Sequence, residues 1–506
     1  MNNKKLYTII FCIIFLSACN KKEKQTTQIM SDSSPKTIES SAVTFDCLNV
    51  PSISSNTPGD TAITSQDGLN CFAWQTFIGL NWEVDPKKPG QPNNNITAKD
   101  FGKTGITQNV VWETYANFKD VMRKNAQPPE PWGTPSISQN ACASQATEKN
   151  IRYMSSSRTN GDFNLDADTA QAFPSQNPNW LADKNGNVVY YEVLMGEDSY
   201  NYITKNKLYD LNQQKIHLEL NKNIVLPQGY DDGATTVQGG LELKAAWLQV
   251  SDPQNPKWLK YKLTQAYIYD DKTNDCTQNL MALVGLHIIH KTASQPQWVW
   301  STFEHIDNVP DTQEIKQDGT VDGDFTFYNN TCAETSIPSG CAAKKVNDQL
   351  VTKTSCDTNV SPAYYLDGTP NCPAYPIRVS RDFPIINTND NHVASINDSV
   401  HQLISQANPD SVFKNYVLVN VLWSSAAVND NKPEGNPPVT PLSTSGETPS
   451  LTSTPVANTM LESYAQGFSC LSCHKNASIS KEAGANKNYA TDYSFIFGGA
   501  QKSPHK

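Results

Sequence analysis

Positive charge and long hydrophobic runs are both scarce in this sequence of 506 residues. Lysine and arginine number 40 against 50 aspartates and glutamates, so the formal net charge is −10 at pH 7. This acidic balance argues against nucleic acid as a partner and is compatible with a basic protein partner. The apolar run at residues 6–16 is too short to cross a bilayer as a stop-transfer helix. The low hydrophobic fraction of 38% is typical of exported, loop-rich β proteins.

The first 19 residues have the order of an export signal. Lys4 and Lys5 precede the apolar run, and small residues precede Cys19. Residues 16–19, Leu-Ser-Ala-Cys, resemble a bacterial lipobox, which implies a signal peptide at 1–18 and a lipid on Cys19. An ordinary signal peptide with an incidental cysteine is the alternative. We therefore expect a lipid-anchored protein of the bacterial cell envelope, on the periplasmic side or at the outer membrane.

The pattern Cys470-Leu471-Ser472-Cys473-His474 has the spacing of a c-type haem attachment motif. Two thiols at this spacing can bond to the two vinyl groups of one porphyrin, and the histidine becomes an axial iron ligand. A structural zinc site needs four ligands, and only His505 follows the motif. Together with the export signal, the motif predicts one covalent haem c with His474 as the proximal ligand.

The 32 residues after His474 contain no methionine. They are too few for a free-standing class I cytochrome c, which needs a longer C-terminal part with a methionine ligand. The iron is therefore either five-coordinate or bound by a residue from elsewhere in the chain. The candidates for this sixth ligand are Met460, His505, His287, His290, His305, His392 and His401.

Hydrophobic periodicity predicts an α+β fold: a large domain with an antiparallel β core and peripheral helices, and a short helical segment for the haem at the C-terminus. A period of two marks strands at 241–250, 260–270, 280–291, 298–306 and 416–423. A helical period marks 70–84, 109–124, 189–212 and 395–407. The tryptophans in the first helix favour a core role over a haem contact.

Composition divides the mature chain into four parts. The lysine-, serine- and threonine-rich stretch 19–45 reads as a disordered tether, and 46–427 as the large α+β domain. Residues 428–457 are rich in proline, serine and threonine and read as a linker. The haem-binding segment is 458–506. Within it, Thr459 and Glu462 fit a capping box that would begin a helix running towards Cys470.

Eight cysteines have no role in lipid or haem attachment or in the signal. In an oxidising compartment this even number predicts up to four disulfides. The pairing is left open, because eight cysteines allow about 105 combinations. They are Cys47, Cys71, Cys142, Cys276, Cys332, Cys341, Cys356 and Cys372.

A second group of polar residues lies in the predicted hairpin formed by 280–291 and 298–306. If the turn is centred near 294–297, His287 lies opposite Glu304 or His305. These three residues could then form a ligand set, either on the distal side of the haem or at a separate metal site. The alternative is a hydrogen-bonded core imidazole beside a carboxylate.

Five stretches of the chain are similar to exported mono-haem cytochrome c family lipoproteins. They are 72–78, 285–292, 298–308, 458–474 and 492–495. The resemblance implies haem binding and implies that the large domain and the C-terminal segment form one unit. It implies no particular reaction.

Three functions are compatible with these features. The first is electron transfer, with a redox partner protein or a small-molecule electron donor or acceptor. The second is a haem enzyme for peroxide, oxygen or a small substrate, with His287, Glu304 or His305 as acid or base. The third is a surface-binding or structural module in which the haem is secondary. Ferric and ferrous absorption spectra, with and without carbon monoxide, separate the first two.

Overall fold

The computed structural model describes one compact unit that lies within Phe45–Lys506. The predicted signal peptide, Cys19, the tether, most of the predicted linker and His505 lie outside the described residues. The described residues are 51–61, 65–105, 107–136, 142–146, 151–155, 172, 179–221, 224–270, 274–346, 348–366, 372–423, 456–474, 477–480 and 488–503.

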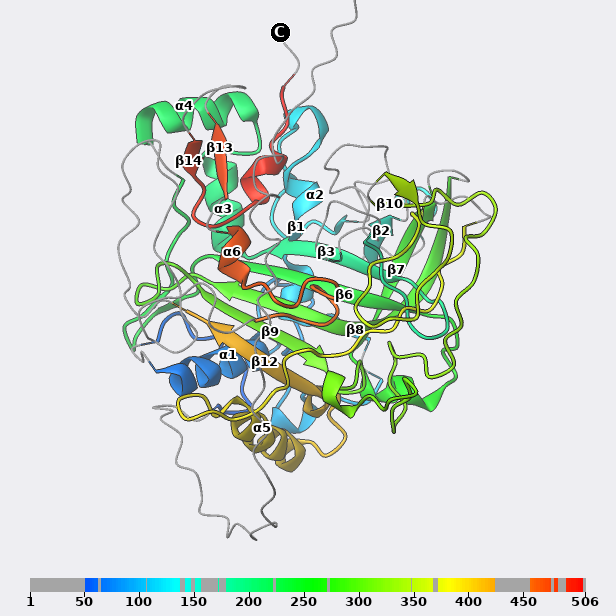
Figure 1. The fold of residues 1–506 in the computed structure, drawn as a ribbon. Helices are drawn as coiled ribbons and strands as arrows, with labels where there is room; N and C mark the ends of the chain where they lie inside the picture. The colour runs from blue at the N-terminus through cyan, green and yellow to red at the C-terminus, as the bar shows by residue number, and fades with distance from the viewer. Residues whose placement is uncertain are drawn as a thin grey trace, which may run out of the picture. The chain divides into compact units, whose positions relative to one another are not determined.

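An eight-stranded, mainly antiparallel sheet forms the core, so the predicted α+β class is confirmed (Figure 1). The long strand β8 (Asp275–His290) pairs along one edge with β6 (Leu241–Val250). Along its other edge it pairs first with β7 (Leu263–Asp270) and then with β9 (Val299–His305). The sheet therefore forks at β8.

The remaining strands extend the two branches of this sheet. On one side β3 (Val189–Met195) pairs with β6, and β1 (Ala116–Asn117) pairs with β3. On the other side the predicted strand at 416–423 is present as β12 (Tyr416–Leu422) and pairs with β9, and the short β2 (Arg152–Ser155) runs parallel to β7.

The hydroxyl of Tyr416 closes the gap where the two branches separate. It donates to the Leu283 carbonyl at 2.8 Å and accepts from the Lys262 amide at 3.0 Å. The Leu283 amide in turn donates to the Lys262 carbonyl at 2.9 Å. The backbone groups freed by the fork are thus hydrogen-bonded in the interior, where an unpaired group would be costly.

Helices α1 (Gln66–Leu80) and α5 (Val393–Ala407) cover one face of the sheet, here called the helix face (Figure 1). Aromatic packing dominates this contact: the rings of Phe77 and Phe303 stack with centroids 4.3 Å apart. Trp74 is fully buried and donates from Nε1 to Asn397 on α5 at 2.9 Å. The core role predicted for the tryptophans of this helix is confirmed.

The C-terminal segment, residues 456–474 and 488–503, packs on the opposite face, here called the tail face. In Figure 1 this orange and red segment crosses the strands and includes α6 (Cys470–His474). The side chain of Asn458 donates to Thr302 Oγ1 at 2.9 Å and to the Phe303 carbonyl at 2.7 Å. Gly285 makes room for it, because a Cβ there would stand 2.8 Å from Asn458 Oδ1.

Smaller elements surround the sheet. These are α2 (Phe118–Val121), α3 (Glu197–Lys205), α4 (Leu211–Asn221), and the two-stranded pairs β4 (Tyr230–Asp231) with β5 (Thr236–Val237), β10 (Lys345–Val346) with β11 (Gln349–Leu350), and β13 (Ser478–Ser480) with β14 (Asn488–Ala490). Among the described residues, no helix has the length and apolarity needed to cross a membrane.

Two helix predictions are wrong. The stretch 109–124 holds a 3₁₀ turn, a short strand and one turn of helix, because Glu113 turns inward to pair with Lys262 at 3.0 Å. The stretch 189–212 begins as strand β3 and becomes helical only after Gly196. Nearly every residue of β3 is buried, so the strand shows no alternation of polar and apolar residues.

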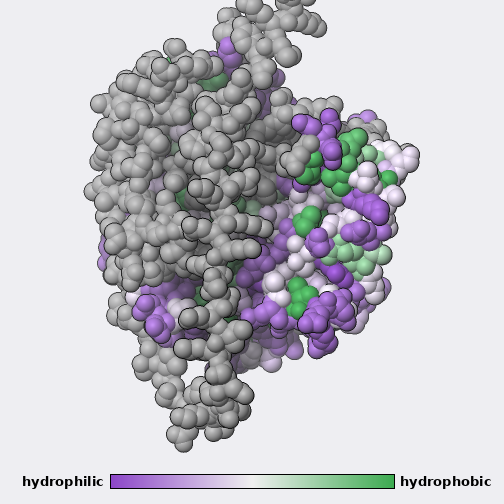
Figure 2. All heavy atoms as spheres, in the orientation of Figure 1, coloured by the Kyte–Doolittle hydropathy of each residue, from purple (hydrophilic) through white to green (hydrophobic). Residues whose placement is uncertain are grey.

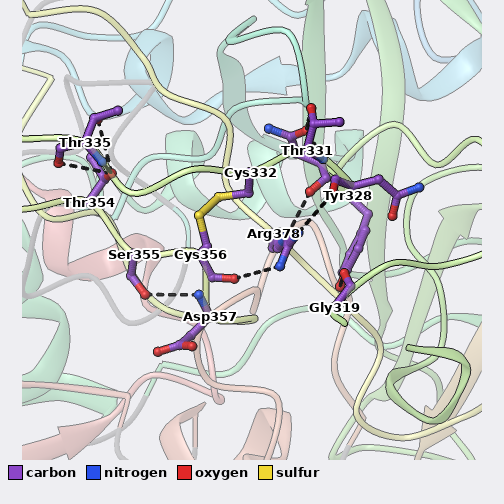
Figure 3. The surroundings of a disulfide bond; sticks show 12 residues. Gly319, Tyr328, Thr331, Cys332, Thr335, Thr354, Ser355, Cys356, Asp357 and Arg378 are labelled. Carbon is purple, nitrogen blue, oxygen red and sulfur yellow. Dashed lines mark hydrogen bonds between the residues drawn. A yellow bond between two sulfur atoms is a disulfide. The ribbon is translucent and has the colours of Figure 1, made fainter. Parts of the chain in front are cut away.

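Three disulfides join described cysteines: Cys142–Cys276, Cys332–Cys356 and Cys341–Cys372. Cys71 is also disulfide-bonded. Figure 3 shows Cys332–Cys356, where the Arg378 guanidinium donates to the Cys356 carbonyl at 3.3 Å. Two of the three bonds lie in 332–372, a stretch with little regular structure of its own.

On the face drawn in Figure 2, the described surface is mostly hydrophilic, with apolar side chains in small groups.

Candidate haem-attachment site

The attachment motif forms α6, a helix of little more than one turn. The longer helix predicted from Thr459 is wrong, and residues 458–469 form successive turns instead. Thr459 does not cap a helix, since its amide and hydroxyl donate to Glu304 Oε2 at 3.0 and 2.6 Å. Glu462 still reaches back, but to the Asn458 amide at 2.8 Å. The Thr459 amide and hydroxyl are therefore hydrogen-bonded to the sheet and cannot begin a helix.

The two motif cysteines are three residues apart on this turn, which brings both side chains to one side of it. Both cysteine residues are half-buried. Between them, Leu471 is fully buried in a cluster with Trp300 and Tyr493 and anchors the turn to the tail face. Burial raises the pKa of the Cys470 thiol well above its ordinary value.

His474 is oriented by one hydrogen bond, in which Nδ1 lies 2.8 Å from the Tyr493 carbonyl oxygen. A carbonyl can only accept, so Nδ1 carries the proton and Nε2 carries the lone pair. Among the described residues, Nε2 has no hydrogen-bond partner. The imidazole also contacts the rings of Trp300 and Phe495, with centroids 4.7 and 5.0 Å away.

Burial lowers the pKa of His474 to about 4, against the opposing effect of the Tyr493 hydrogen bond. The imidazole is therefore neutral at physiological pH, the form that binds a metal. Metal-binding histidines usually donate their other N–H to a carbonyl or carboxylate, as His474 does here. The residues present fit a haem iron bound at Nε2.

A strained turn directs the Tyr493 carbonyl towards His474. Asp492 and Tyr493 have φ angles of +56° and +65°, in the left-handed region that favours glycine. Such residues cost about 1–3 kcal/mol each and persist only where the surroundings impose them. Asp492 Oδ2 accepts from Lys291 Nζ at 2.5 Å and from the Leu226 amide at 2.7 Å. Its carbonyl accepts from Trp298 Nε1 at 2.9 Å.

The predicted partner of His287 in the β8–β9 hairpin is wrong by two or three residues, because the turn is centred at the lower end of the predicted range 294–297. His287 pairs with Thr302, and Glu304 pairs with Gly285. The φ of Trp298 is +69°, and its amide closes a turn on the Gln295 carbonyl at 2.9 Å. It therefore lies in the connection, and β9 begins one residue later.

The group predicted from His287, Glu304 and His305 is not assembled. Glu304 forms an ion pair with Arg381 and accepts from Thr459. His305 is fully buried, and both its nitrogens bond to main chain, Nε2 to the Lys260 carbonyl and Nδ1 to the Asp307 amide. Its ring stacks on Tyr261. His305 is the hydrogen-bonded core imidazole of the alternative interpretation.

His287 lies on the tail face, and its Nε2 is 2.8 Å from Glu462 Oε1. Lys244 is its cross-strand neighbour on β6. The charges of His287, Lys244 and Glu462 all act on His474, so this polar group lies beside the motif. Glu462 could not be recognised from the sequence as the partner of His287, because its position fitted a helix cap.

The other described candidates for a sixth ligand have different contacts. His290 stacks on Phe72 on the helix face, 5.3 Å between centroids, and His392 pairs with Asp67 at 2.6 Å. His401 bonds to the Tyr416 carbonyl at 2.6 Å. Met460 is fully buried.

Comparison with known proteins gives no match: no family model, no curated protein and no solved structure is similar to this chain. Within the described part of the chain, no three histidine, cysteine, aspartate or glutamate side chains converge as a metal-ion site.

Replacing Lys291 by methionine should leave the Asp492 carboxylate buried without its cation, since both side chains of the pair are fully buried. Removing one partner of a buried pair costs about 3–5 kcal/mol of unfolding free energy. Urea denaturation measures this loss. The matched control is Lys316→Met, because the Lys316–Asp322 pair is 51% and 90% exposed. Loss of this exposed pair should change the unfolding free energy little. Equal effects of the two substitutions would contradict the role of the buried pair.

Proposed function

We propose that this protein is a mono-haem c-type cytochrome that transfers electrons. The observation that carries the proposal is the hydrogen bond from His474 Nδ1–H to the Tyr493 carbonyl, next to the two motif thiols. This bond fixes the tautomer that leaves Nε2 as a ligand. A metal-free role for the motif would not need a neutral imidazole held in this way.

Each residue of the motif has one task in this proposal. Haem c supplies an iron that changes its charge by one electron. Cys470 and Cys473 hold the porphyrin through thioether bonds, and His474 binds the iron through Nε2. Tyr493 holds the imidazole in position, and Trp300 and Phe495 provide apolar contacts beside it. Phe495 is 51% exposed, so part of its ring can also contact the porphyrin.

The proposal also includes the location of the protein. Cys19, at the end of the predicted signal peptide, carries the lipid that anchors the chain to a membrane of the cell envelope. Electrons pass to or from a redox partner protein or a small molecule in that compartment. The acidic net charge of −10 suits a basic partner.

A haem enzyme is the second candidate, and the His287–Glu462 pair favours it. A histidine held by a carboxylate beside an open haem face can donate and accept protons during peroxide or oxygen chemistry. Here the pair is 17% and 20% exposed, so solvent reaches it. Glu304 and His305 contribute nothing to this candidate, because their contacts lie elsewhere.

Absorption spectra separate the two candidates. Electron transfer predicts a six-coordinate, low-spin iron in the purified protein, with little binding of carbon monoxide to the ferrous form. A high-spin ferric spectrum with rapid peroxide turnover, lost in His287→Ala and kept in His401→Gln, would favour the enzyme. His401 is the matched histidine on the helix face.

The double substitution Cys470→Ala/Cys473→Ala should abolish covalent haem, because both thioether bonds need these thiols. Haem staining of the denatured protein on a gel measures this loss. Cys332→Ala/Cys356→Ala removes two cysteines from the disulfide drawn in Figure 3 and should keep the stain. Covalent haem in the first variant would refute the assignment of the motif.

A further inference from the structure

A buried glutamate on β6 has no role in the site described so far. Glu242 is 6% exposed on the tail face, and its Oε2 accepts a hydrogen bond from Ser494 Oγ at 3.0 Å. Among the described residues, its Oε1 has no hydrogen-bond partner. A buried carboxylate oxygen without a partner is costly when the group is charged, whereas a protonated carboxyl avoids most of this cost.

Its neighbours also favour the protonated form. Asp492 is close enough for its charge to act on Glu242, and the ion pair with Lys291 uses only Asp492 Oδ2. The other oxygen, Oδ1, is buried and has no hydrogen-bond partner in the part of the chain that the structure describes. Burial and the nearby Asp492 raise the pKa of Glu242 to about 8. Glu242 therefore holds a proton at neutral pH that an exposed glutamate would have lost.

A short path joins this carboxyl to the histidine of the motif. Glu242 bonds to the Ser494 side chain, and the preceding residue, Tyr493, accepts the hydrogen bond from His474 Nδ1. Within the turn, the Ser494 amide donates to the Thr491 carbonyl at 3.0 Å and Thr491 Oγ1 donates to the Ser494 carbonyl at 2.7 Å. The turn is thus held by its own hydrogen bonds, and it connects the Glu242 carboxyl to the Nδ1 side of the imidazole through Ser494 and Tyr493.

We propose that Glu242 is a proton site linked to the oxidation state of the haem on His474. The inference rests on the proposed function. The Glu242 carboxyl would release its proton to solvent and become a carboxylate when a haem held by His474 lost one electron to the redox partner. The carboxylate would take up a proton when that haem regained an electron. Charge beside the motif then changes little between the two states.

The direction of the effect follows from the charges. A ferric iron carries one more positive charge than a ferrous iron, so it favours the Glu242 carboxylate. As the pH rises through the range where Glu242 titrates, the ferric state is stabilised and the midpoint potential falls. For one proton and one electron the slope approaches ~59 mV per pH unit.

Other charged groups face the same region from each packed element. Lys244 lies on β6, His287 on β8, Glu462 in the segment before α6, and Lys291 and Asp492 form the neighbouring ion pair. The charge of Asp492 also contributes to raising the pKa of Tyr202 on α3. The test must therefore isolate Glu242 from these groups.

The experiment measures the midpoint potential of the haem-loaded protein between pH 6 and pH 10. The wild type should show a potential that falls with pH around pH 8, and Glu242→Gln should remove this fall while keeping the bond to Ser494. Glu83→Gln is the control, because that carboxylate accepts a hydrogen bond from Asn93, a loop residue outside the C-terminal segment, at 3.2 Å. It should behave as the wild type. An unchanged slope in Glu242→Gln overturns the inference.

A measurement on the wild type covers the case in which Glu242→Gln does not fold. The infrared difference spectrum between the oxidised and reduced protein should lose the C=O stretch of a protonated carboxyl on oxidation. No such band at neutral pH overturns the inference. If the purified protein has no haem absorbance, the proposed function fails instead, so the two failures are distinguishable.

Discussion

The hydrogen bond between His474 Nδ1 and the Tyr493 carbonyl is the contact on which the other parts of the site depend. It requires two successive residues in the left-handed region, and each costs about 1–3 kcal/mol. The Asp492–Lys291 ion pair and the bond from Trp298 offset that cost. Both partners come from the β8–β9 connection. The position of the histidine is therefore set by the sheet, and α6 is too short to set it alone.

The two faces of the sheet differ in chemistry. The helix face is packed with aromatic rings, such as Phe77 on Phe303, and provides the rigid core. The tail face carries polar pairs: Glu304 with Thr459 and Glu242 with Ser494 are buried, and His287 with Glu462 is half-buried. A buried polar group without its partner is costly, so these pairs tie the C-terminal segment to one position. Electron transfer and any linked proton would take place on this face.

Several parts of this arrangement could be predicted from the sequence. Strand β6 alternates clearly, and the predicted 241–250 agrees with the structure. Helix α5 was also predicted within two residues. The partner of His287 was predicted wrongly because the sequence located the turn centre only to the range 294–297, and each residue of error in the centre moves a cross-strand partner by two. The helix expected at 109–124 failed because Glu113 pairs with Lys262, which lies far away in the sequence.

The residues of the attachment motif could be predicted from the sequence, but the groups around them could not. The spacing of Cys470, Cys473 and His474 indicates haem attachment without any structure. Tyr493 acts through its backbone carbonyl, which leaves no signature in residue type. Glu242 and Lys244 look like the solvent side of an ordinary strand, but the C-terminal segment covers that side.

The most direct test of the central claim is the intact mass of the purified protein, produced with a cytochrome c maturation system and denatured before measurement. Covalent attachment at Cys470 and Cys473 predicts a mass equal to the processed chain plus one haem. The mass of the processed chain alone would contradict the account.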